Sequence, residues 1–269
     1  MRDRCARGRT NNLRRVREHV SHHNWFAVGV DFAIVVIGVF VGIQASNWNQ
    51  ARLDRGQARE YRAMLQSDLD ANLENLAMRK RYYGWVRDEA LATLAGLKRP
   101  SSNVDGQFLV DAYQATQIQP WALKRNTYDE ILSVGAMAKL GDPLLRDKIA
   151  NYYVTSDVTG ANISVVPPYR DIVRRIMPYA VQQAIRARCN ERIVQNSRGS
   201  VDIILPKGSC PLGLDATTVR QAVIQVHDWP TLALDVNRQL VDLDQKLLSV
   251  DAIWRRATAL KAALKDADS

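Results

Sequence analysis

The most pronounced hydrophobic pattern in the chain is an apolar stretch that lies between two tryptophans, Trp25 and Trp48. As a helix, residues 26–46 would rise about 31 Å, close to the thickness of the hydrocarbon core of a bilayer. The two tryptophans would then lie at the membrane interfaces, where indole side chains are enriched. The pattern therefore predicts a transmembrane helix over residues 25–48.

One face of this predicted helix carries small residues and an acid. At 100° per residue, Gly38, Gly42 and Ala45 lie within about 40° of Asp31. Small residues let membrane helices approach closely, and a helix–helix contact would also shelter the acid from lipid. We interpret Asp31, Gly38, Gly42 and Ala45 as a self-association stripe. The alternative is that Asp31 reaches the membrane interface and the glycines are incidental.

A cleaved signal peptide is another interpretation of the same stretch. The uninterrupted apolar core, residues 32–43, has the length of a signal-peptide h-region, and residues 43–45 are a conceivable cleavage site. The tryptophan pair, the glycine stripe and a helical pattern that continues past Trp48 favour an uncleaved anchor.

The chain after Trp48 is predicted to be almost entirely helical. Apolar residues at three- and four-residue steps continue without a linker to about Leu97, where the turn-forming residues 98–106 end the pattern. In the shorter helices that follow, Thr127 and Glu130 form a capping box, Asp142 and Asp215 are N-caps, and Pro178 introduces a kink. These helices are predicted at residues 108–117, 127–137, 143–153, 168–189 and 216–227.

Strand patterns occur only between two cysteines. Residues 192–195 and 201–205 predict a small hairpin, and we expect a disulfide between Cys189 and Cys210 that stabilises the fold by roughly 3 kcal/mol. The alternative is two buried free thiols in a cytosolic domain.

A coiled-coil-like seam of apolar residues runs from Leu232 to Leu264. Its natural partner is the helix over residues 50–97, packed antiparallel, although the seam could instead pair with another subunit. The predicted fold class is mainly α. A single N-terminal transmembrane helix precedes an elongated helical bundle, which has long N- and C-terminal antiparallel helices and one small disulfide-linked β-hairpin.

The chain has a formal net charge of +9, and this charge affects the predictions mainly at the N-terminal tail. Residues 1–24 contain seven arginines, which anionic lipid would attract. Nucleic acid is not an expected partner, since the chain has no zinc spacing, RNP-type motif or recognition-helix context. His19, His22 and His23 have helical spacing but no carboxylate or cysteine beside them, so we expect no metal site and no cofactor.

Charge and cysteine usage together predict the topology. Arginines flank the apolar stretch on both sides and only slightly favour a cytoplasmic tail. The cysteine pair adds to this bias, because disulfides form in oxidising compartments. The predicted organisation is a basic cytoplasmic tail over residues 1–24, a transmembrane helix over 25–48 and a helical periplasmic domain over 49–269.

Three segments, at residues 36–49, 126–135 and 144–153, together resemble a family of uncharacterised bacterial proteins. Its members have one N-terminal membrane helix, which ends in a Gln-x-x-Asn-Trp-Asn-type sequence, and a helical domain. The resemblance covers residues 28–155, and Asp31 stands where the family usually has glutamate. It implies an inner-membrane location and no known reaction, cofactor or catalytic residue.

No motif indicates catalysis. Cys189 and Cys210 are too far apart in sequence for a CxxC redox site. The carboxylates Asp68, Asp70, Glu74, Asp88 and Glu89 lie among lysines and arginines on amphipathic helices, which is typical of a solvated face. The aromatic segments at residues 152–153 and 167–169 could line a pocket, but core packing is the favoured interpretation.

The sequence therefore favours a non-enzymatic, membrane-anchored envelope protein that acts as an oligomerising scaffold or accessory subunit. Its expected partners are the membrane, further copies of itself through the transmembrane helix, and another envelope protein. A periplasmic ligand-binding sensor is the alternative. An enzyme whose site has no recognisable motif is a third, less favoured class.

Overall fold

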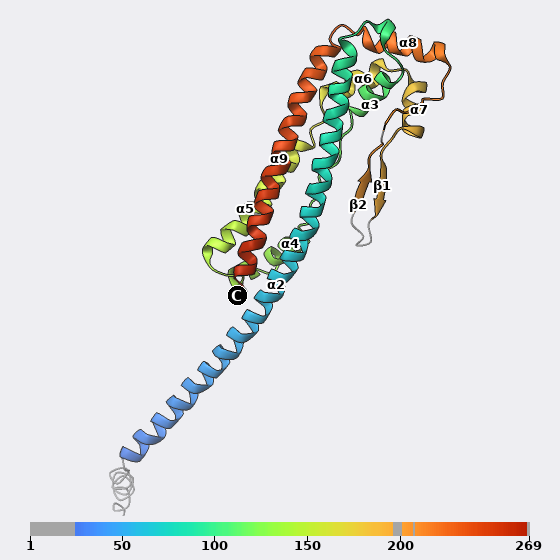
Figure 1. The fold of residues 1–269 in the computed structure, drawn as a ribbon. Coiled ribbons are helices and arrows are strands. Elements are labelled where there is room, and N and C mark those ends of the chain that lie inside the picture. The colour runs from blue at the N-terminus through green and yellow to red at the C-terminus, as the bar shows by residue number, and fades with distance from the viewer. Residues whose placement is uncertain (1–24, 196–200, 207, 268–269) are drawn as a thin grey trace, which may run out of the picture. The chain divides into compact units, whose positions relative to one another are not determined.

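A computed structural model describes residues 25–195, 201–206 and 208–267 (Figure 1). The chain has two structural units, residues 1–57 and 58–269, and the boundary between them falls inside helix α2 (Trp25–Leu97). The predicted basic tail at residues 1–24 lies outside the described residues.

In the first unit, α2 carries an apolar surface that is not buried. The bulky apolar residues from Phe26 to Ile43 keep between 41% and 79% of their surface exposed. An 18-residue window of the helix has a mean hydropathy of 2.2, and none of the window is buried. This part of α2 is therefore long and apolar enough to cross a membrane.

The second unit is built on an antiparallel pair of long helices, α2 from Ala58 onward and α9 (Leu232–Asp266) (Figure 1). Exposed ion pairs connect them, and each step up α2 matches an equal step down α9. They are Asp70 with Lys261, Lys80 with Asp251 at 2.9 Å, and Arg87 with Asp244 at 2.6 Å. The seam on α9 thus pairs within the chain, which confirms the antiparallel arrangement.

The facing sides of these helices form the centre of the core. Burying such side chains stabilises the fold by about 1.5–3 kcal/mol each, and their three- and four-residue spacing keeps them on one face. Deeply buried examples are Leu65, Leu69, Leu76, Val86 and Ala90 in α2, and Val236, Leu243, Val250, Ile253, Ala257 and Leu264 in α9.

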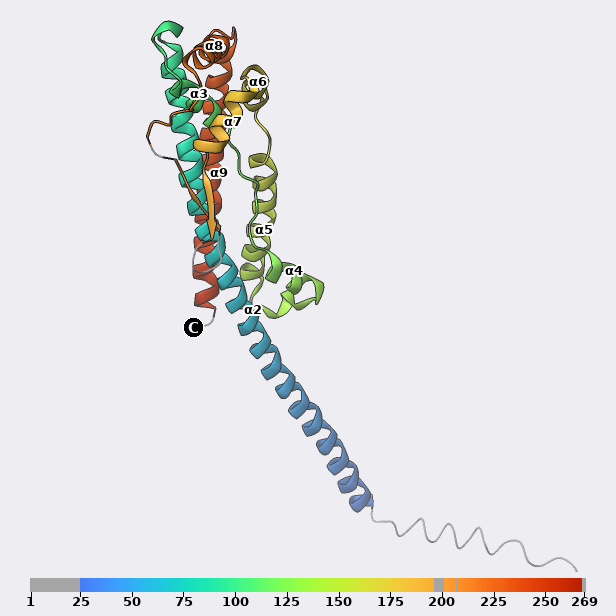
Figure 2. The same cartoon turned by 90° about the vertical axis from the view of Figure 1, so that its right-hand side faces the viewer.

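Short helices cover this pair. Helix α5 packs along α9, and α6 also contacts α9 (Figure 2). The bounds are α3 (Gln107–Gln114), α4 (Asn126–Ser133), α5 (Pro143–Ile163), α6 (Pro168–Ile176), α7 (Tyr179–Arg188) and α8 (Ala216–His227), with 3-10 turns at η1 (Ser101–Asn103) and η2 (Ala136–Lys139).

Two predicted helix starts are confirmed. A side-chain oxygen of Asp142 accepts the N–H of Leu145 at 2.8 Å, with Pro143 in the first turn of α5. Asp215 caps α8 in the same way, accepting the N–H of Thr218 at 2.9 Å. Each carboxylate satisfies a backbone donor that has no partner within its helix.

The predicted capping box at Thr127 is wrong. Helix α4 starts one residue earlier, and Thr127 is buried with its N–H donating to Asp68 of α2 at 3.3 Å. Asp68, an acid from another helix, thus accepts the backbone N–H of Thr127 that the side chain of Glu130 was expected to accept. The helix also ends at Ser133, before Met137, because Gly135 adopts a left-handed conformation with φ 66°.

The other predicted short helices differ in length. Helix α3 stops at Gln114, and α5 continues ten residues past Tyr153 to Ile163. Pro178 separates α6 from α7 and does not merely kink one helix, because the residue before a proline disfavours helical backbone; Met177 has ψ 127°.

The predicted hairpin is confirmed in its described part. Strands β1 (Arg192–Gln195) and β2 (Val201–Ile204) pair antiparallel, with Arg192 opposite Ile204. The connection between the strands lies outside the described residues.

Candidate functional site

The self-association stripe lies on open helix surface. Asp31, Gly38, Gly42 and Ala45 are all exposed, and a Cβ atom added to Gly38 or Gly42 would meet no heavy atom within 4 Å. The flanking tryptophans are also exposed, Trp25 at 81% and Trp48 at 64%. No described part of the chain covers the stripe, so its pairing with a second helix stays a prediction.

The predicted disulfide is present. Cys189 directly follows α7 and is joined to Cys210, with their Cα atoms 5.8 Å apart. Cys189 is 1% exposed, and Cys210 packs at the margin of the core.

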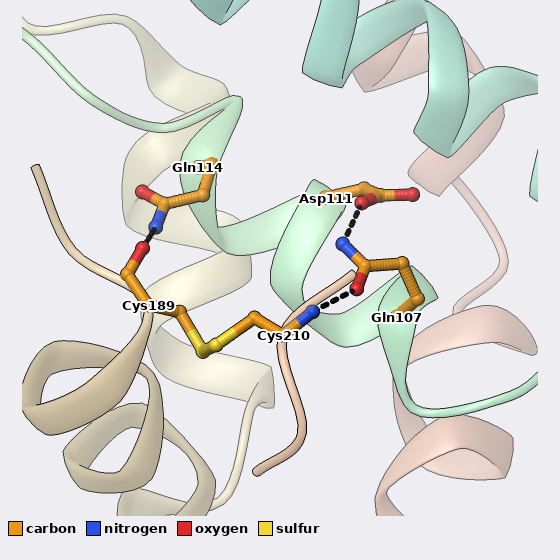
Figure 3. The surroundings of a disulfide bond; sticks show 5 residues. All are labelled: Gln107, Asp111, Gln114, Cys189 and Cys210. Atoms are coloured by element: carbon orange, nitrogen blue, oxygen red, sulfur yellow. Dashed lines mark hydrogen bonds between the residues drawn. A yellow bond between two sulfur atoms is a disulfide. The ribbon is translucent and has the colours of Figure 1, made fainter. Parts of the chain in front are cut away.

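Helix α3 holds both sides of this disulfide (Figure 3). The side-chain oxygen of Gln107 accepts the N–H of Cys210 at 2.9 Å, and the side-chain amide of Gln114 donates to the carbonyl of Cys189. The two glutamines are seven residues apart and therefore share one face of α3. The disulfide and α3 form one hydrogen-bonded cluster.

A pair of carboxyl groups extends this cluster. The amide of Gln107 also donates to Asp111 at 2.7 Å (Figure 3), and Asp111 interacts with Glu89 of α2. Burial first, and then the neighbouring Asp111 carboxylate, together raise the pKa of Glu89 to about 7. Burial also raises the pKa of Asp111. The pair can hold a proton near neutral pH.

This result corrects the sequence interpretation of the acidic pair at residues 88–89. Asp88 is exposed as expected, but Glu89 is half-buried beneath α3 and is not part of a solvated face. Asp111 was not predicted as part of a site because it is the one charged residue of a short helix. A contact between α2 and α3 creates the pair, and helix periodicity does not encode such a contact.

We expect the protein to lose stability as the pH rises from about 4.5 to about 7. Folded Glu89 holds its proton to about pH 7, whereas an ordinary glutamate in the unfolded chain loses it near 4.5. The folded state therefore binds more protons in this window, and stability falls with rising pH. Since Glu89 is partly solvated, we expect a loss of about 1 kcal/mol.

The variant Glu89→Gln tests this assignment. It should flatten the pH dependence of urea unfolding between about pH 5 and pH 8. The exposed neighbour variant Asp88→Asn should change the dependence much less, because Asp88 contributes least to the raised pKa. An equal slope in wild type and Glu89→Gln would show that another group takes up the proton.

The two aromatic segments do not meet in one pocket. Tyr152 and Tyr153 are buried and, with Trp121, line a small cavity of about 170 Å³; Tyr128 stacks on Tyr153 at 4.2 Å between ring centroids. Tyr169 lies elsewhere in the core, and its hydroxyl donates to the carbonyl of Ala112 at 3.1 Å. Core packing is therefore confirmed for these three tyrosines.

Metal ligation finds no support among the described residues, which contain no cluster of three or more histidine, cysteine or acidic side chains suited to a metal ion. The three histidines at positions 19, 22 and 23 lie outside those residues.

In comparisons with family models, curated proteins and solved structures, the chain has no match.

Proposed function

We propose that this chain is a non-enzymatic, membrane-anchored envelope protein, which presents its helical second unit in the periplasm as an oligomerising scaffold or accessory subunit. The observation that carries the proposal is the exposed apolar surface of α2 between Trp25 and Trp48. Soluble monomers rarely leave contiguous apolar surface of this extent in water. A lipid bilayer would cover it, and a helix already satisfies its own backbone hydrogen bonds there.

Two further features support the periplasmic side for the second unit. The disulfide between Cys189 and Cys210 favours an oxidising compartment, and the slight excess of arginines before the apolar stretch favours a cytoplasmic tail.

Fractionation and protease accessibility test the anchor and its topology. The full-length chain should remain in membranes washed with alkaline carbonate, and protease added to intact spheroplasts should digest the second unit. Release by carbonate would contradict the anchor, and protection of the second unit would contradict the topology.

Association through the stripe is tested by Gly38→Leu. In the structure a Cβ atom added at Gly38 meets no heavy atom within 4 Å, so we expect an effect on mass to arise between chains. Small residues let membrane helices approach closely, and a leucine side chain at this position would hold the two helices apart. We expect detergent-extracted Gly38→Leu, and likewise Asp31→Leu, to shift from oligomer to monomer in light scattering coupled to gel filtration.

Gly29 offers a matched control on the same helix. It also has open space around it, and it lies about 160° away from Asp31, on the opposite face. Gly29→Leu should keep the oligomeric mass of the wild type. An unchanged mass in Gly38→Leu, or an equal loss in both glycine variants, would count against the stripe.

A ligand-binding sensor is the second candidate function. The specific observation that favours it is a cleft between α9 and the end of α5, which contains a buried lysine. A scaffold has no need of such a cleft, whereas a sensor requires one. Saturable thermal stabilisation of the protein by a small molecule would support this candidate.

A further inference from the structure

The cleft lies between one face of α9 and the segment that joins α5 to α6. It has a volume of about 330 Å³, which is within the range of small-molecule sites. Its two walls differ in chemistry. The α9 wall is polar, with Arg238, Asp242, Gln245, Lys246 and Ser249, and the opposite wall is largely apolar, with Ile163, Val165, Pro167 and Pro168 beside Asn162.

Helical spacing explains the polar wall. Residues 238, 242, 245 and 249 follow each other at three- and four-residue steps, so they share one stripe of α9, and Lys246 borders it. The neighbouring buried positions, Leu243 and Val250, face the core. The same helix thus packs one side against the core and presents a charged side to the cleft.

Lys246 is the unusual member of this wall. It is only 7% exposed, which is rare for lysine, and the charge that favours its ionised form is Asp242, four residues earlier on α9. Its ammonium donates to the carbonyl of Val165 at 3.3 Å and lies 5.6 Å from the ring centroid of Tyr83. An ammonium has three donors, and among the described residues this is its one hydrogen bond. Burial lowers the pKa of Lys246, so an anion beside it would stabilise its charged form.

The charges of the cleft restrict what can bind. Arg238 and Lys246 are cationic and Asp242 is anionic, which leaves one net positive charge in the lining. A singly charged anion matches this balance, whereas a dianion would exceed it and an amine would add to the positive charge. The apolar wall, with Ile163, Val165 and the two prolines, offers contact to a hydrocarbon chain.

We propose that this cleft binds a small amphiphilic monocarboxylate, with the carboxylate between Lys246 and Arg238 and the hydrocarbon chain against Ile163, Val165 and Pro167. Charge-assisted hydrogen bonds to the carboxylate supply the unused donors of Lys246 with acceptors. The proposal extends the sensor candidate, and it stands whether or not the chain forms oligomers or is anchored in a membrane.

Hexanoate is the probe for this site, with hexan-1-ol and hexylamine as neutral and cationic probes of equal chain length. The full-length wild-type protein should be stabilised saturably by hexanoate in thermal unfolding, and titration calorimetry should give a finite affinity. Neither hexan-1-ol nor hexylamine should stabilise the protein as much as hexanoate does. Absence of saturable hexanoate binding, or equal binding of hexan-1-ol, would overturn the proposal.

Variants assign the binding to this cleft. Arg238→Gln, at an exposed position, should weaken hexanoate binding about tenfold, and Lys246→Met should weaken it at least as much. Arg255→Gln is the control, because Arg255 is exposed on the same helix and outside the cleft. If Lys246→Met fails to fold, Arg238→Gln decides alone. Wild-type affinity in Arg238→Gln, or an equal loss in Arg255→Gln, would refute the site.

Discussion

Replacing both Cys189 and Cys210 with alanine is expected to lower the free energy of unfolding by about 3 kcal/mol. The two cysteines are 21 residues apart. Closing a loop of this length lowers the conformational entropy of the unfolded chain, which stabilises the folded state by about 3 kcal/mol. Loss of the disulfide should also loosen α3, because Gln107 and Gln114 hydrogen-bond to the backbone of the two cysteines. Urea unfolding followed by circular dichroism measures the difference.

A reductant provides an independent check. Wild-type protein treated with dithiothreitol should approach the stability of the double variant, and the variant itself should not respond. A wild type whose unfolding midpoint is insensitive to dithiothreitol would show that the disulfide contributes little to the fold.

Asn72→Ala is expected to have an effect of similar size. Asn72 is 1% exposed, and its side chain pairs with both backbone groups of Lys124, accepting its N–H at 2.6 Å and donating to its carbonyl at 2.9 Å. It also donates to the hydroxyl of Tyr152 at 3.2 Å. Alanine would leave these polar groups in the interior without their partner, and we expect a loss of about 3 kcal/mol.

Asn237→Ala is the matched control for this change. Asn237 is exposed on α9, so its replacement should alter stability by less than about 0.5 kcal/mol. If the two variants unfold at the same urea concentration, the hydrogen bonds of Asn72 do not hold the segment around Lys124 in place.

Sequence periodicity predicted the long helices well because the information is local. The repeat of apolar residues in α2 and α9 follows from packing each helix along one face, and the end of α2 at Leu97 coincides with turn-forming residues. The disulfide was predictable because the second unit contains only two cysteines. N-caps such as Asp142 were predictable because the side chain bonds to its own helix.

Features that depend on contacts between distant segments were not predictable. Asp68 takes over the cap of α4 from another helix, and α3 buries Glu89 next to Asp111. The backbone of Lys124 depends on Asn72, which in sequence is one polar residue of a long helix. The cleft at Lys246 requires α5 to extend to Ile163, ten residues past its predicted end.

The antiparallel pairing of α2 with α9 has a consequence for biosynthesis. The ion pairs between the helices join residues 157 to 191 positions apart, so the core-facing leucines of α2 emerge from the ribosome long before their cover is translated. Contacts of such long range also form slowly. Until α9 arrives, the exposed face of α2 would be a binding site for chaperones that prevent aggregation.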